Sequence, residues 1–176
     1  MFFSKKNRGP DVTDIVFMGE SGCNNAIAKW LQDNNQGIVV AWFQHELEQL
    51  RTKLGSFSEN RFVLADRLVF SLGAPKPILF AGHYPIHSPE MDLCEKTGLD
   101  KMLVYTHLDA PLFKIFGSDR IKELMIKMGM NEDEPVNHSM ITSAIIKAQE
   151  KIAKEYLTDM HSSSEEEWFR LNITGK

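Results

Sequence analysis

Polar side chains that could do chemistry recur directly after short apolar runs of the chain. If those runs are strands of one parallel sheet, the polar residues meet at its carboxyl edge, where ligands of open α/β sheets usually bind. The sequence therefore predicts a polar rim suited to a small molecule or a metal ion. The ligand-binding candidates on this rim are Glu20, Cys23, His45, Asp66, Arg67, His83 and His107, with Gln44 and Asp109 beside them.

His83, His87 and Glu90 form the sharpest candidate for a metal site. Two imidazoles and a carboxylate suit zinc or iron. Their spacing crosses an expected strand-to-helix turn and matches no established metal-binding signature. The alternative is that both histidines are hydrogen-bonded surface or capping residues.

Cys23 lies near the start of an expected helix, where a thiol has a lowered pKa. It could then act as a nucleophile with His45 or His83 as its base, although a lone cysteine in such a turn is usually only packed. The preceding loop 19–22 (GESG) has the strand–loop–helix context of a phosphate-binding loop. It has no lysine and carries a glutamate where phosphate would lie, so we predict no cofactor.

Five short apolar runs bounded by polar, Gly or Pro residues predict the strands that would position this rim. Helical spacing of apolar residues follows the first and second runs, a helix start signal at Ser88-Pro89 follows the fourth, and 68–77 has room for a short helical turn. Such alternation predicts an α/β three-layer sandwich with a mostly parallel five-stranded sheet, RecA-like or Rossmann-like, followed by a C-terminal helical extension. The runs are 15–18, 38–43, 62–64, 78–81 and 102–105.

The same patterns divide the chain into four parts. Residues 1–13 are expected to be a flexible N-terminus, with order beginning near Asp14. Residues 14–109 form the α/β domain, 110–160 the helical extension, and 161–176 an acidic tail that contains aromatic residues.

The helical extension ends in a helix, expected at 139–156, with a continuous apolar stripe. The stripe must pack against the chain's own sheet domain, against a second protein, or against another copy as a homo-oligomer. The tail either stays exposed or docks through its two aromatic rings. The protein-binding candidates are Ile141, Ile145, Ile152, Tyr156, Trp168 and Phe169.

Composition excludes several classes of function. The formal net charge of −4 argues against a nucleic-acid partner, because Lys and Arg do not outnumber the acids. No apolar run of about 18 residues predicts a transmembrane segment, and the opening MFFSKKNRGP is the reverse of a secretory signal. We therefore expect a soluble cytoplasmic protein without a structural disulfide, since its two cysteines are far apart.

Residues 104–152 carry a family resemblance. A strand with an acidic turn (VYTHLD, 104–109) leads to FGSDR (116–120), a Met-rich helix, Gly-Met, an acidic stretch with Glu-Pro (132–135) and a helix with Ala-Gln-Glu-Lys. This order is similar to SecA, the preprotein translocase ATPase, where its second RecA-like motor domain runs into the helical scaffold. GIVVAWFQHELEQLRTKL (37–54), FVLADRL (62–68) and ILFAGHYPIH (78–87) resemble earlier parts of that domain.

The resemblance implies a motor-like domain, but the family's catalytic motifs are missing from these 176 residues. There is no Gly-Lys-Thr loop to hold phosphates, and 90–98 (EMDLCEKTG) has no arginine where the family has its arginine finger. We therefore expect no ATP hydrolysis by the chain alone. The leading hypothesis is a SecA-related, catalytically incomplete module that binds a protein partner and is linked to protein export. The alternative is a small ligand- or metal-binding protein, or an enzyme, that uses the rim.

Overall fold

A five-stranded, entirely parallel sheet forms the centre of the computed structural model, which describes residues 9–68, 76–156 and 158–173. Residues 1–8 of the expected flexible N-terminus and most of the expected helical turn at 68–77 lie outside these ranges. The strands lie in the order β1-β5-β4-β2-β3. They are β1 (Asp11–Phe17), β2 (Ile38–Ala41), β3 (Phe62–Leu64), β4 (Ile78–Ala81) and β5 (Lys101–His107).

The predicted fold class is confirmed, with small changes at strand ends. β1 begins at Asp11, three residues before the expected start of order, because it pairs with β5 from Asp11↔Lys101 to Phe17↔His107. The strand order places β1 at the edge of the sheet, and all seven of its residues pair with β5.

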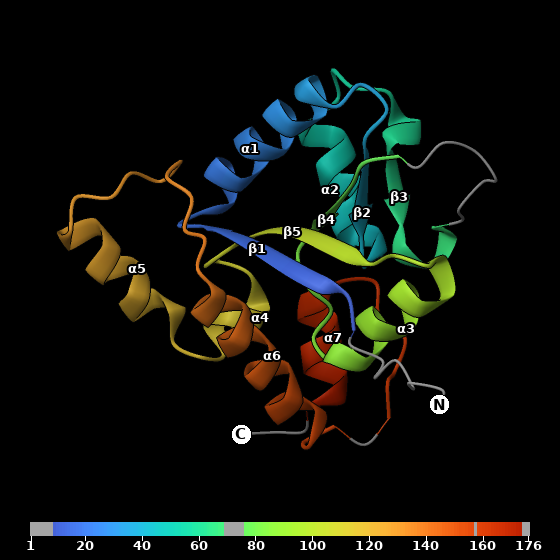
Figure 1. Ribbon diagram of the computed structural model, residues 1–176. Helices are drawn as coiled ribbons and strands as arrows, with labels where there is room; N and C mark the ends of the chain where they lie inside the picture. Colours follow the sequence, from blue (N-terminus) through green and yellow to red (C-terminus); the bar gives the residue numbers. More distant parts are fainter. Residues whose placement is uncertain (1–8, 69–75, 157, 174–176) are drawn as a thin grey trace, which may run out of the picture.

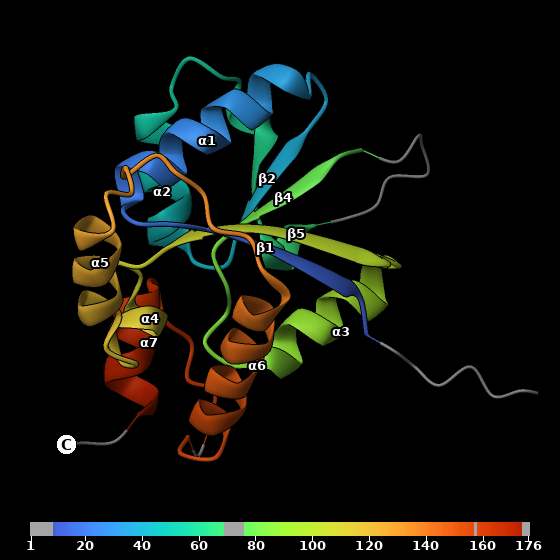
Figure 2. The ribbon, with the colours of Figure 1, turned by 60° about the vertical axis from the view of Figure 1, so that its left-hand side comes forward.

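Helices cover both faces of the sheet, as Figures 1 and 2 show. α1 (Glu20–Asp33) and α2 (Gln44–Lys53) lie on one face, since the chain moves in one direction from β1 to β2 and β3. It then turns back to β4 and β5, which places α3 (His87–Thr97) on the opposite face. Short 3₁₀ helices, Glu59–Arg61 and Ala65–Arg67, flank β3.

The C-terminal third adds four helices, α4 (Pro111–Lys114), α5 (Ser118–Lys127), α6 (Ser139–Ala153) and α7 (Glu165–Asn172). Between α5 and α6 the chain returns to the sheet, where Val16 and Val136 exchange backbone hydrogen bonds of 2.9 and 2.8 Å. Figure 2 shows α6 and α7 on the same side of the sheet as α3. None of the helices in the described ranges is long and apolar enough to span a membrane.

The apolar stripe of α6 packs inside the molecule, together with α7. Trp168 is fully buried, so the tail docks through its aromatic rings rather than remaining exposed. This packing uses the side chains that were candidates for binding a second protein or another copy. The cluster joins Ile141, Ile145, Ile152, Tyr156, Trp168 and Phe169 to Phe43, Ile86 and Leu112.

Candidate functional site

A cavity of about 640 Å³ opens at the carboxyl ends of β1, β2, β4 and β5. The connections after β2 and β4 leave toward opposite faces of the sheet, and ligands of open α/β sheets bind at such a switch point. Part of the predicted rim therefore comes together here. The rim residues that line the cavity are Glu20, Cys23, His45, His107 and Asp109.

The other three ligand-binding candidates do not reach this cavity. Asp66 and Arg67 are exposed in the short 3₁₀ helix that follows β3. His83 follows β4 but is buried, and its ring bonds to carboxylates of β1 and α3. The sequence correctly predicts that all three residues follow strands. Whether each side chain reaches the cavity depends on the path of the chain after the strand, which the sequence pattern does not show.

Three charged side chains of the cavity form ion pairs among the described residues. Lys53 forms an ion pair with Glu20, and the Nζ atom of Lys122 lies 2.9 Å from Asp109 Oδ1. His107 lines the cavity with a lowered pKa, because burial disfavours its charged form, and its Nδ1 atom has no hydrogen-bond partner among the described residues. Lys114 also lines the cavity, and among the described residues it has no carboxylate oxygen within 4.0 Å.

Glu46 and Glu165 are two carboxyl groups of the cavity that sequence reasoning missed. The Glu165 N–H donates to Glu46 Oε1 at 3.0 Å, and the Glu165 carboxyl accepts from the Leu112 N–H at 2.9 Å. Burial and the nearby charge of Glu46 raise the pKa of Glu165 to about 8. Burial likewise raises the pKa of Glu46, whose Oε2 atom has no partner within the described ranges. Glu165 lies in an acidic run that reads as a solvated tail, so no local signal marked it.

Cys23 is not placed to act as a nucleophile. Its side chain is 3% exposed within the apolar core, and burial followed by the charge of Glu20 raises the pKa of its thiol to about 12. The helix N-terminus was expected to lower that pKa, but desolvation of the thiolate dominates. Of its two proposed bases, His45 pairs with Gln49 at 2.9 Å and His83 bonds elsewhere.

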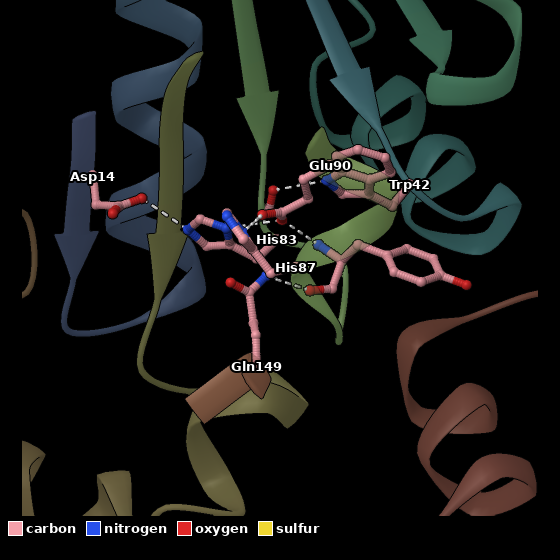
Figure 3. Close-up of polar contacts among 8 residues, drawn as sticks. Asp14, Trp42, His83, His87, Glu90 and Gln149 are labelled. Atoms are coloured by element: carbon pink, nitrogen blue, oxygen red, sulfur yellow. Dashed lines mark hydrogen bonds and ion pairs between the residues drawn. The ribbon is translucent and has the colours of Figure 1, made fainter. Parts of the chain in front are cut away.

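His83 lies between two buried carboxylates, as Figure 3 shows. Its Nε2 atom is 2.7 Å from Asp14 Oδ1, and its Nδ1 atom is 2.9 Å from Glu90 Oε1. Burial alone would lower the pKa of His83, but Glu90 and Asp14 outweigh it and raise the pKa to about 10. In turn the His83 charge outweighs burial and lowers the pKa of Glu90 to about 2. His83 is therefore a buried imidazolium.

The three metal candidates meet, but as hydrogen-bonding partners. His87 Nδ1 lies 3.3 Å from Glu90 Oε2, and both ring nitrogens of His83 are occupied by carboxylates. A protonated imidazole offers no lone pair to a metal. Within residues 9–68, 76–156 and 158–173, no group of three or more His, Cys, Asp or Glu is arranged to hold a metal ion.

The same network ties the sheet to the helical extension. Glu90 also accepts the Tyr84 N–H at 2.8 Å, and the Gln149 side chain donates to the Tyr84 carbonyl at 2.8 Å. Figure 3 shows Gln149 reaching this group from α6. The network therefore has a structural role, since its hydrogen bonds connect β1, the loop after β4, α3 and α6.

The first turns of α1 are covered by the acidic linker that precedes α6. A Cβ atom built on Gly22 would collide with the Glu132 carbonyl oxygen, and Asn25 Nδ2 donates to Asp133 Oδ1 at 3.3 Å. In phosphate-binding loops this helix end holds the phosphate. Here an acidic segment of the chain lies against one side of this helix end, while Glu20 and Cys23 of the same turn line the cavity.

Sequence comparison relates one segment of the chain to known proteins. No protein-family model matches the chain. Over 48 residues, 27% of the chain, it is 50% identical to the protein translocase subunits SecA of Desulfotalea psychrophila and Acidithiobacillus ferrooxidans, and 44% identical to that of Sorangium cellulosum. The match spans only 5–6% of the length of these relatives. The chain therefore contains a 48-residue stretch similar to SecA, and the predicted resemblance is confirmed to that extent only.

Proposed function

We propose that the chain is a SecA-related accessory module that binds protein, is linked to protein export, and does not hydrolyse ATP by itself. The observation that carries the proposal is the 48-residue match to translocase subunits, at up to 50% identity. The five-stranded parallel sheet supports it, because it agrees with the RecA-like domain that the resemblance implies.

The β1–α1 turn supports the non-catalytic part of the proposal. Gly22 lies against the backbone of Glu132, so an acidic linker covers one side of the first turn of α1. Glu20 adds a carboxylate at the same helix end, and Lys53 is already paired with it. A helix N-terminus that carries and is covered by acidic groups disfavours a further anion.

An exposed apolar helix face supports the protein-binding part. On α5, Ile121, Leu124 and Met128 are 50%, 58% and 69% exposed. Large side chains clustered in water commonly mark an interaction site. We therefore assign protein binding to this face of α5, because the earlier candidates on α6 and α7 pack in the core.

Two measurements on the full chain test the proposal. Calorimetric titration with ATP and Mg²⁺, together with a phosphate-release assay, should show neither saturable binding nor turnover. Saturable micromolar binding with turnover would overturn the non-catalytic assignment. Cells that lack the chain should accumulate unexported precursor proteins, and unchanged export kinetics would overturn the link to export.

The strand-end cavity supports a second candidate function, binding of a small organic cation. Glu46 Oε2 is buried without a hydrogen-bond partner among the residues that the structure describes, and the raised pKa of Glu165 keeps that carboxyl mostly protonated at neutral pH. An ammonium group would pair Glu46 and relieve its desolvation. Butylammonium should then bind saturably in an NMR titration while butanol does not, and Glu46→Gln should abolish the difference. Equal shifts with both compounds would exclude this candidate.

A further inference from the structure

The exposed face of α5 is a fixed surface. Ser118 Oγ donates to the Leu108 carbonyl at 2.7 Å, and Met125 is buried in a cluster with Val16, Met18 and Leu108. At about 100° per residue, Ile121, Leu124 and Met128 fall within one arc of about 60° on another side of the helix. Figure 1 shows α5 at the edge of the molecule, away from the sheet. We call these three residues the α5 stripe.

One edge of the α5 stripe carries two cations. Arg120 and Lys127 lie about 40–60° from Leu124 on the helical wheel, both on the same side. In the part of the chain that the structure describes, neither lies within 4.0 Å of a carboxylate oxygen. The opposite edge of the stripe leads to Met125 and the core. The surface is therefore apolar with a basic border on its one open side.

We propose that the α5 stripe docks an amphipathic helix of a partner protein, with acidic residues along the edge that meets Arg120 and Lys127. The proposal rests on the proposed protein-binding function and names its surface and partner chemistry. Leu124 and its neighbours contribute apolar burial, and the flanking ion pairs fix the orientation of the partner. Charge complementarity thus selects the partner, while burial of the stripe supplies affinity.

A second copy of this chain fits the surface less well. In an antiparallel two-fold pairing of α5 with itself, the same edges meet, so Arg120 and Lys127 would face Arg120 and Lys127 of the other copy. In a parallel pairing the basic edge would face the Met125 edge, which is already packed against the chain's own core. Like-charge repulsion therefore opposes the antiparallel pairing, and lack of space opposes the parallel one. A different partner with acidic flanks meets neither obstacle.

The test uses the full chain and two designed peptides of about 18 residues. Both carry leucines at helical i, i+3 and i+7 spacing, one with glutamates and one with lysines beside them. Fluorescence polarisation should show saturable binding of the glutamate peptide, at least about tenfold tighter than that of the lysine peptide. Raising the salt concentration should weaken this preference, because the flanking pairs are exposed.

Leu124→Ser and Ile126→Ser form a matched pair of variants. Both side chains are 58% exposed, but Ile126 lies about 160° around the helix from Leu124. Leu124→Ser should weaken glutamate-peptide binding at least about tenfold, and Ile126→Ser less than about twofold. The double variant Arg120→Glu/Lys127→Glu should reverse the preference so that the lysine peptide binds tighter. Circular dichroism checks that each variant keeps its helices.

Three outcomes would overturn the docking proposal. These are equal affinity for both peptides, equal effects of Leu124→Ser and Ile126→Ser, and self-association that only Leu124→Ser abolishes without any peptide binding. If the chain does not bind the peptides but its deletion still impairs export, only the proposal for the α5 stripe is refuted. Normal export with intact peptide binding refutes the export link and leaves the surface standing.

Discussion

Replacing His83 by alanine should destabilise the protein more than any other single change in the buried polar network. The side chains of His83, Asp14 and Glu90 are 3%, 0% and 2% exposed. His83→Ala removes the imidazolium and leaves two carboxylates without their counter-charge. Losing one partner of a buried ion pair costs about 3–5 kcal/mol of unfolding free energy, a large share of the total for a domain.

The contacts that remain show where most of this cost arises. Glu90 keeps the Tyr84 N–H and His87 as partners, whereas Asp14 loses the only side-chain bond that the described residues give it, since its Oδ2 atom already has none. Adding Asp14→Asn to His83→Ala should therefore recover about 1–2 kcal/mol, because the unpaired buried charge disappears. The double variant would be more stable than the single one.

Urea unfolding followed by circular dichroism measures these differences. His87→Ala is the matched control, since His87 makes one longer bond of 3.3 Å to the same Glu90 and its side chain is 25% exposed. We expect it to cost about 0.5–1 kcal/mol. If His83→Ala costs no more than His87→Ala, or if Asp14→Asn makes the double variant worse, the imidazolium is not holding buried charge.

The pH dependence of the same pair gives an independent check. The folded pKa of His83 is raised to about 10 from an ordinary value of 6.5. Its stabilisation is therefore complete below pH 6.5 and is lost as the pH rises toward 10. The gap between the wild type and His83→Ala should narrow over that range. A gap that widens as the pH rises would mean that His83 is neutral in the folded protein.

Three further predictions test other parts of the structure. Trp168→Ala should cost about 3–5 kcal/mol of unfolding free energy in urea, because the ring is fully buried among Tyr84, Phe169 and α6; a cost below about 1 kcal/mol would mean that α7 is not docked. The raised pKa of Glu165 predicts stabilisation that is complete below pH 4.5 and is lost as the pH rises to about 8, so Glu165→Gln should flatten the stability profile over that range, and an unchanged slope would contradict this. Gly22→Ala should push the Glu132 backbone away and speed hydrogen exchange of the linker amides, at a cost of about 1–3 kcal/mol; unchanged exchange would show that the linker does not lie over α1.

Most of the fold could be predicted from local sequence. The five strands appear where apolar runs are bounded by turn residues, and the all-parallel order agrees with alternating strand and helix patterns. The runs identify strands because both faces of a parallel sheet are buried. The start of β1 at Asp11 was missed, since polar residues at a strand end look like a loop until the pairing with β5 is known.

The candidate sites were predictable only in part. Residues that follow strands do meet at one edge, which brought Glu20, Cys23, His45 and His107 to one cavity. Spacing could not show that His83 turns away from that cavity, or that Glu165 from the far end of the chain enters it. The contacts that decide this join His83 to Asp14 and Glu165 to Glu46, which are 69 and 119 positions apart in the sequence.

The sequence by itself determined the strands, the parallel sheet and the SecA-like segment, because these depend on local periodicity and on residue identity along the chain. Only the tertiary structure decided what each polar and apolar group does. Burial in the core raises the pKa of Cys23, whereas the carboxylates of Asp14 and Glu90 keep His83 charged although burial opposes its charge. Packing also takes Trp168 into the core and leaves Leu124 in water. Desolvation and pairing depend on neighbours in space, and local sequence does not specify those neighbours.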